Sequence, residues 1–295
     1  MNKTTYLILL LLVCNIANGQ LNKTITDKKG KRMLLGKVDK KGFKHADFSW
    51  FQKNYEDYLV NDKIVDILGT KLKDYKIKVF FGSWCGDSKR EVPKFYKVLT
   101  KAEFDNKNLA LVAVDRKPEA YKASPSGEEK GLNIHRVPTF IFYKGDKEIG
   151  RIVEYPKEDF ERDMLKIVQE QKYTSNYAVV TYLDKVMKDK GVEELANKLN
   201  FYAKYVSEYV KGSKELNTYG YKLLRSGQLK KALVVFELNT LIFPYKANVF
   251  DSYAEALFEA KEYQKSLKNY GIALSFEPQN KEIIERINSI KTMVN

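Results

Sequence analysis

The amino-acid sequence predicts an α/β domain followed by an all-α domain of helical repeats. Short apolar runs of strand type alternate with helical patterns as far as residue 170, and this alternation is typical of α/β proteins. From residue 176 onward no strand pattern remains, and apolar residues recur at helical spacing. This second part also matches itself at an offset of 34 residues, which indicates a repeat. We therefore place one domain over 20–173 and the other over 174–295.

Residues 1–19 have the pattern of a signal peptide. Lys3 supplies a positive charge, residues 6–13 are apolar, and small residues at 17–19 suit cleavage before Gln20. The apolar run is shorter than the ~20 residues that span a bilayer. We therefore expect an exported protein, periplasmic or secreted, without a transmembrane span.

A lipoprotein is the less favoured alternative for the N-terminus. It would use Cys14 as the lipidated residue, but Leu12 and Val13 before it lack the small side chain that such a site normally needs. The sequence holds two cysteines. If Cys14 is removed on export, Cys85 becomes the only cysteine of the mature protein, and no intramolecular disulfide can form.

The α/β domain is expected to open with an edge strand at 33–38 and a helical stretch over 47–73. A strand at 76–82, an amphipathic helix at 90–101 and a second strand at 109–114 follow. Both strands are short, apolar and rich in β-branched or aromatic residues, which favours buried strands. A strand, helix, strand order predicts a parallel βαβ unit.

The remainder of this domain is predicted to be a polar connection, a hairpin and a closing helix. The connection at 117–131 is polar and contains Pro118, Pro125 and Gly127. Strands at 139–143 and 148–153 flank the turn 144–147, and such short, Gly-containing turns join antiparallel strands. The closing helix covers 158–170.

The C-terminal repeat is carried by five pairs of residues. Shifted by 34 positions, Gly220, Leu223, Ala232, Phe236 and Pro244 align with Ala254, Leu257, Ser266, Tyr270 and Pro278. The period, the small residues and the terminal proline resemble the tetratricopeptide repeat (TPR). We predict repeats over about 213–246 and 247–280, a degenerate helical pair over 179–210 and a capping helix over 281–294.

Composition excludes several function classes. The formal net charge is +14, from 52 Lys and Arg against 38 Asp and Glu, but the excess is spread along the chain. We interpret it as a lysine-rich solvated surface and expect no nucleic-acid partner. Two histidines and two cysteines are too few for most zinc sites. We therefore predict no metal and no cofactor.

The candidate for chemistry is the segment Trp84-Cys85-Gly86-Asp87-Ser88-Lys89. It follows the strand at 76–82 and opens the next helix. Free N–H groups and a partial positive charge at a helix N-terminus stabilise a thiolate over a thiol. We therefore expect Cys85 to be partly exposed and nucleophilic.

A second segment, Arg136-Val137-Pro138-Thr139, opens the strand at 139–143. A proline at this point suits a cis peptide bond. Such a bond would leave the preceding backbone amide free to pair with an extended peptide. Val137, Pro138 and Thr139 are therefore candidates for substrate binding.

The segment from about 30 to 170 resembles the thioredoxin family. The resemblance lies in the strand order and in matching residues, which are Trp84, Cys85, Gly86, Lys89, Pro93, Val137, Pro138 and Thr139. It implies a thioredoxin-like fold in which Cys85 attacks disulfides of substrates. It also implies that Trp84, Gly86 and Asp87 contact the substrate together with the residues around Pro138.

The sequence departs from the thioredoxin pattern at four positions. Ser88 replaces the second, resolving cysteine, so the usual dithiol cycle cannot run within one chain. Val79 replaces a buried aspartate that handles protons in many thioredoxins. Asp87 and Glu154 replace a proline and a glycine, and both carboxylates would disfavour a nearby thiolate. Ser88 is either a donor to that thiolate, and so part of the catalytic site, or a helix residue without a role.

These features lead to two functional hypotheses. The first is a monothiol thiol–disulfide exchange protein with an isomerase, deglutathionylating or client-trapping role. Cys85 would take a client protein or a low-molecular-weight disulfide, and the helical repeats would bind a protein or peptide partner or brace the first domain. The alternative is a redox-inactive scaffold of the cell envelope. We expect the two domains to unfold separately, because damage in repeat arrays stays local.

Overall fold

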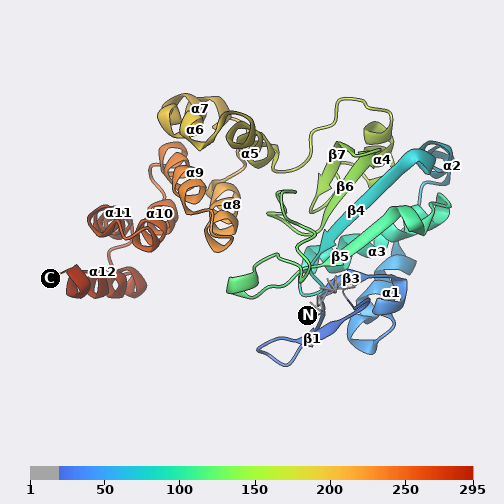
Figure 1. The fold of residues 1–295 in the computed structure, drawn as a ribbon, viewed down its shortest axis with the longest axis horizontal. Coiled ribbons are helices and arrows are strands. Elements are labelled where there is room, and N and C mark those ends of the chain that lie inside the picture. The colour runs from blue at the N-terminus through green and yellow to red at the C-terminus, as the bar shows by residue number, and fades with distance from the viewer. Residues whose placement is uncertain (1–19, 295) are drawn as a thin grey trace, which may run out of the picture.

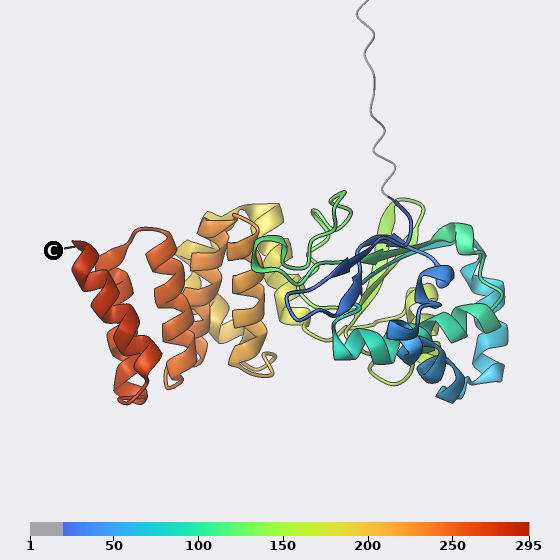
Figure 2. The same ribbon diagram turned by 90° about the horizontal axis from the view of Figure 1, so that it is seen from below.

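The computed structural model describes residues 20–294 of the chain; the predicted signal peptide and Cys14 lie outside the described residues. The predicted fold class is confirmed. An α/β part with a mixed sheet is followed by an all-helical part, and the two lie side by side in an elongated molecule (Figures 1 and 2). No helix within 20–294 has the length and apolar character needed to cross a membrane.

The central sheet has five strands in the order β3-β5-β4-β6-β7. β4 (Tyr75–Phe81) runs parallel to β5 (Leu109–Ala113), and α3 (Gly86–Lys101) connects them, which confirms the predicted βαβ unit. β6 (Thr139–Lys144) and β7 (Lys147–Val153) form the predicted hairpin on the other side of β4.

The predicted edge strand at 33–38 is two short strands in different sheets. β2 (Arg32–Leu34) pairs with β1 (Thr24–Thr26) in a two-stranded ribbon. β3 (Gly36–Val38) pairs antiparallel with β5 at the edge of the main sheet. Leu35 separates β2 from β3, so the first half of the apolar run pairs with β1 and the second half pairs with β5.

The helical stretch over 47–73 is also divided, into α1 (Ser49–Asp57) and α2 (Asp62–Lys71). Asn61 caps α2 by accepting a hydrogen bond from the Ile64 amide at 3.3 Å. The buried carboxylate of Glu161 stabilises the connection between α1 and α2. It accepts hydrogen bonds from Tyr58 Oη at 2.6 Å and from the Asn61 amide at 2.9 Å. A residue 100 positions away thus fixes where α2 begins.

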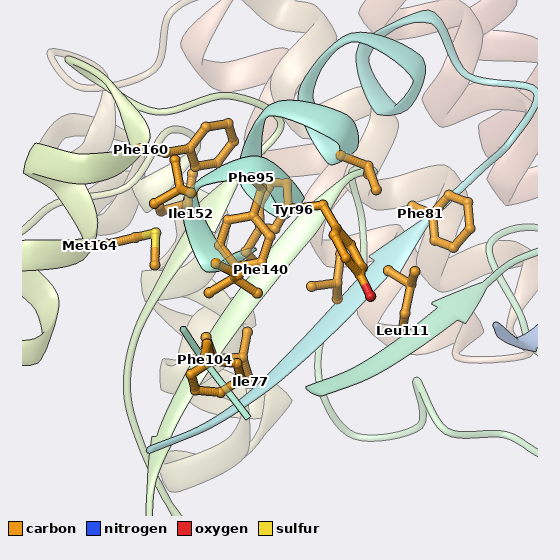
Figure 3. Packing of buried hydrophobic residues seen from close by; sticks show 14 of the residues in the cluster. Ile77, Phe81, Phe95, Tyr96, Phe104, Leu111, Phe140, Ile152, Phe160 and Met164 are labelled. Carbon is orange, nitrogen blue, oxygen red and sulfur yellow. The ribbon is translucent and has the colours of Figure 1, made fainter. Parts of the chain in front are cut away.

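One face of the sheet is covered by α1 to α4, the last of which spans Phe160–Val168. Side chains alternate along each strand, so Ile77, Leu111, Phe140 and Ile152 all point to this face. Figure 3 shows them packed with aromatic residues of the helices, chiefly Phe95, Tyr96 and Phe160. This cluster is the main hydrophobic core of the α/β part.

The opposite face is covered by an irregular segment, residues 115–138, instead of a helix of any length. Phe80, Val112 and Ile141 alternate with the core residues and point to this side, where Ile134 and Val137 pack on them. The segment contains only a short 3-10 helix, Pro118–Ala120. Trp84 and Cys85 pack against the same cluster, so the candidate thiol lies on this face.

The C-terminal part consists of eight helices. Three of them fill the region where we predicted a helical pair, and the other five form two hairpins and a terminal helix (Figure 2). Their bounds are α5 Ala178–Lys190, α6 Val192–Asn197, α7 Leu199–Val206, α8 Ser213–Arg225, α9 Leu229–Ile242, α10 Ala247–Glu259, α11 Tyr263–Phe276 and α12 Lys281–Val294. Equivalent helices of the two hairpins begin 34 residues apart.

The repeated residues lie where the helices are packed most closely. A Cβ atom on Gly220 would come within 2.6 Å of the Phe236 ring, so α8 and α9 approach through a glycine. Ala232 and Phe236 of α9 and Tyr270 of α11 are buried. These positions are therefore packing residues of the hairpins.

Candidate thiol site

Cys85 lies at the junction of β4 and α3. It is the N-cap residue of α3, and its amide donates to Gly82 O at 2.8 Å. Its side chain is half-buried, and Sγ donates to Val137 O at 3.4 Å. The sulfur therefore lies beside the first turn of α3, where backbone N–H groups are free of helical partners.

Trp84 is held in place next to the sulfur. Its Nε1 donates to Val114 O at 2.9 Å, which fastens the indole to the end of β5. A Cβ atom on Gly82 would come within 2.6 Å of the same indole. Gly82 is therefore needed for the close approach of the Trp84 ring.

Val137, which is followed by Pro138 and Thr139, contacts the sulfur through its carbonyl oxygen. The Val137–Pro138 peptide bond is cis, as the sequence predicts. All three side chains are buried, and Cys85 both donates to the Val137 carbonyl and packs against the cluster that contains Val137. Thr139 Oγ1 donates to Arg136 O at 2.7 Å, which closes the turn.

Ser88 has a partner other than the thiol. It is fully buried, and its Oγ accepts a hydrogen bond from the Gly82 amide at 3.1 Å. Within 20–294 no hydrogen bond joins Ser88 to Cys85. The hydroxyl thus supports the loop that carries Trp84 and Cys85, whereas its role as a thiolate donor stays a prediction.

Replacement of Ser88 by alanine separates these two roles. If the hydroxyl serves Gly82, Ser88→Ala leaves a buried N–H unpaired and lowers the free energy of unfolding by about 1–3 kcal/mol. The alkylation rate of Cys85 should stay unchanged. Urea unfolding and iodoacetamide kinetics measure the two quantities, with Ser275→Ala on exposed helix surface as the control. Slower alkylation at unchanged stability would instead establish a thiolate donor.

The two carboxylates that we expected to oppose the thiolate are both paired with arginines. Asp87 accepts from Arg90 at 2.7 Å. Glu154 accepts from Arg136 at 3.1 Å and from the Tyr177 hydroxyl. The ion pairs offset the negative charge that these residues add to the site.

The backbone at Glu154 places it beside Pro138. Its φ is 64°, in the left-handed region that favours glycine, which fits the glycine that the thioredoxin pattern has there. Its amide donates to Pro138 O at 2.8 Å. Where a glycine would have no side chain, the Glu154 side chain thus extends to Arg136, next to the cis peptide bond.

The sequence reasoning missed Lys122, a lysine buried at this site with 4% of its surface exposed. Its Nζ donates to His135 O. Burial, together with the positive charge of Arg136, lowers the pKa of Lys122 to about 7, while negative charge on Cys85 and Glu154 acts in the opposite direction. Lys122 is therefore a buried amine in the loop beside the thiol, and burial is the main cause of its lowered pKa.

The helical part reaches this site through α8. Lys222 Nζ donates to the carbonyl oxygens of Tyr121 and Lys122, at 2.9 and 3.2 Å. Arg136 Nη2 donates to Thr218 Oγ1 at 3.2 Å. In both ribbon views the loop between β5 and β6 lies against the helical part (Figures 1 and 2). No sequence signal pointed to this contact, which joins residues about 100 positions apart.

Comparisons with known proteins agree with this geometry. A sequence profile of the thioredoxin family matches residues 43–166. Thioredoxin H2 of Arabidopsis thaliana is 28% identical over 88 residues, which is 30% of this chain and 59% of that protein. A thioredoxin-like protein of Acanthamoeba polyphaga mimivirus is 25% identical over 126 residues, which is 40% of this chain and 80% of the viral protein.

Residues 43–166 therefore form a thioredoxin-like domain. The profile ends before α5, so the chain combines this domain with an all-helical part that the family match does not include.

Proposed function

We propose that the protein is a thiol–disulfide exchange protein in which Cys85 is the nucleophile. The observation that carries the proposal is the position of the half-buried Cys85 Sγ, at the N-terminus of α3 and 3.4 Å from the carbonyl before a cis proline. The thioredoxin-family match supports a thiol–disulfide redox role. The monothiol mechanism is our inference from Ser88.

The first step is attack of the Cys85 thiolate on one sulfur of a client disulfide. A new S–S bond joins Cys85 to that sulfur while the old S–S bond breaks. The second client sulfur leaves as a thiolate with the bonding electron pair and takes a proton from solvent. The helix N-terminus stabilises the attacking thiolate.

Release requires a thiol from outside the site, because Ser88 cannot resolve the mixed disulfide. Either a low-molecular-weight thiol or another cysteine of the client attacks the client sulfur, and Cys85 leaves as a thiolate. When the client supplies the thiol, its disulfides are rearranged without net oxidation. The need for a thiol from outside the site supports an isomerase, deglutathionylating or client-trapping role.

Cys85→Ser provides the test. The purified protein is incubated with a protein that carries scrambled disulfides and with a reduced low-molecular-weight thiol. We expect a mixed disulfide at Cys85 by non-reducing mass spectrometry and recovery of client activity. Cys85→Ser should lose both and keep its fold, since the side chain is only half-buried. Wild type without an adduct would favour the redox-inactive scaffold.

We also propose that the helical part is a tetratricopeptide-type array that braces the thiol domain. The 34-residue offset between α8 and α10 and between α9 and α11, and the Gly220–Phe236 approach, support the repeat assignment. The hydrogen bonds from Lys222 to the loop at 121–122 support the bracing role. A separate partner for the repeats stays an expectation.

Export is proposed from the N-terminal sequence alone. Lys3, the apolar run at 6–13 and the small residues at 17–19 support cleavage before Gln20. N-terminal sequencing of the protein recovered from its native compartment checks it. An N-terminus at Met1 would contradict signal-peptide cleavage, and a lipid-modified Cys14 would establish the lipoprotein alternative.

A further inference from the structure

A pocket of about 300 Å³ lies where α8 meets the thioredoxin-like domain. The wall from that domain consists of Tyr121 and Arg136, and the wall from the helical part consists of Lys214, Asn217, Thr218, Tyr221 and Arg225. The α8 residues recur at helical spacing, so they form one face of that helix. The pocket thus exists only when both parts are present.

All charged residues that line this pocket are cations. Of the three, Arg136 pairs with Glu154, whereas Lys214 and Arg225 have no carboxylate within ion-pair distance in residues 20–294. A neighbouring cavity of about 660 Å³ differs, because Glu119, Glu129 and Asp184 line it together with its cations. Among the described residues, the lining of the smaller pocket therefore holds three cations and no carboxylate, although Arg225 also lines the neighbouring cavity.

The two arginines are oriented before any ligand binds. The Arg225 guanidinium lies 4.8 Å from the centre of the Tyr121 ring and 5.3 Å from that of Tyr221. The Arg136 guanidinium lies 4.5 Å from the centre of the Tyr177 ring and donates to Thr218 Oγ1. Guanidinium groups held in this way match the planar geometry of a carboxylate.

One residue of the pocket wall is adjacent in sequence to the residue that contacts the thiol. Arg136 directly precedes Val137, whose carbonyl oxygen is 3.4 Å from Cys85 Sγ. Tyr121 also lines the pocket; partial burial raises the pKa of its hydroxyl, and smaller contributions come from charge on Arg225, Arg136 and Cys85. A disulfide bound at Cys85 therefore has this cationic pocket within reach of its flanking groups.

We propose that this pocket is an anion subsite that selects disulfides carrying a carboxylate close to the sulfur. The inference rests on the proposed function of Cys85. The carboxylate can belong to a small disulfide or to an acidic residue beside a client cysteine, and both present the same group to Lys214, Arg225 and Arg136. The helical part would then contribute directly to substrate choice.

The test compares two small disulfides of different charge. The rate constants for Cys85 are measured with 5,5′-dithiobis(2-nitrobenzoate), which carries two carboxylates, and with neutral 4,4′-dithiodipyridine. Each reaction forms one mixed disulfide and releases one chromophoric thiol. For Lys214→Gln with Arg225→Gln, we expect the anionic-to-neutral ratio of rate constants to fall on the order of ten-fold at low salt. An unchanged ratio overturns the subsite.

A matched control removes the same charge elsewhere. Lys185→Gln with Lys265→Gln changes two exposed lysines outside the pocket, and its ratio should equal that of wild type. An equal fall in this control shows a general charge effect and overturns the proposal. In unmodified protein the ratio must also decrease with ionic strength, so a salt-independent ratio overturns it even if the variant does not fold.

Two further probes identify the source of the carboxylate. Synthetic peptide disulfides with Glu or with Gln beside the cysteine are compared in the same assay. A preference for the Glu peptide assigns the subsite to client proteins, and a preference confined to the small anionic disulfide assigns it to small molecules. Absence of both preferences overturns the inference. Failure of wild type to react with either small disulfide would instead refute the proposed function of Cys85.

Discussion

Phe236→Ala is expected to lower the free energy of unfolding of the helical part by about 3–5 kcal/mol. Phe236 is fully buried, contacts the backbone of Gly220 and meets Tyr221 edge-on at a centroid distance of 5.1 Å. Its removal leaves a cavity between α8 and α9 that a glycine cannot fill. Helical circular dichroism during urea unfolding measures the loss.

Leu241→Ala on the same helix is the control, because that side chain is 42% exposed and its loss should cost much less. In Phe236→Ala, the reaction of Cys85 with iodoacetamide should change in the range where the helical part unfolds first. The reason is that α8 donates hydrogen bonds to the loop at 121–122. Thiol kinetics identical before and after that transition would contradict a bracing role.

The second large effect concerns Lys122 and pH. With a pKa near 7 when folded and about 10.4 when unfolded, this lysine is charged in both states below pH 7, and the cost of burying the charge is then fully present. Between these values the unfolded chain binds more protons, so stability rises with pH. The contribution of Lys122 should increase by about 3 kcal/mol between pH 6.5 and 9.5.

Lys122→Met removes this contribution. The difference in unfolding free energy between wild type and Lys122→Met should therefore shift in favour of wild type by about 3 kcal/mol over that range. Lys172→Met, at an exposed position, should show no such shift. Parallel stability curves for wild type and Lys122→Met would show that the lysine does not deprotonate on folding.

The parts of the fold that could be predicted are those with local signals. Three patterns each indicate the local structure of the residues that carry them: the apolar runs at 76–82 and 109–114, the helical periodicity of the C-terminal part, and the repeated Gly220, Ala232 and Phe236. The predicted positions of β4, β5 and the β6–β7 hairpin are confirmed on that basis. The break between α1 and α2 has no comparable signal, because Glu161 holds it from a distant helix.

The residues of the candidate site also fall into those that a local sequence pattern marks and those that it does not. Cys85 and the cis proline are marked by short motifs, whereas Lys122 and Arg136 acquire their surroundings only through the fold. Lys122 lies in a polar connection where a lysine ordinarily faces water, and burial under His135 and α8 gives it its properties. Separate unfolding of the two domains stays a prediction, and the structure places α8 against the loop that carries this lysine.

The irregular segment that covers the second face of the sheet determines what is lost when the two parts of the protein are separated. Residues 115–138 overlie this face, and two of their carbonyl oxygens accept hydrogen bonds from Lys222 of α8. In the same segment, Arg136 donates a hydrogen bond to Thr218 of α8. A fragment that ends near residue 173 would keep the thioredoxin-like sequence and lose these partners. The two parts are therefore not interchangeable modules, and grafting either one onto another protein would transfer its fold without the complete surroundings of the thiol.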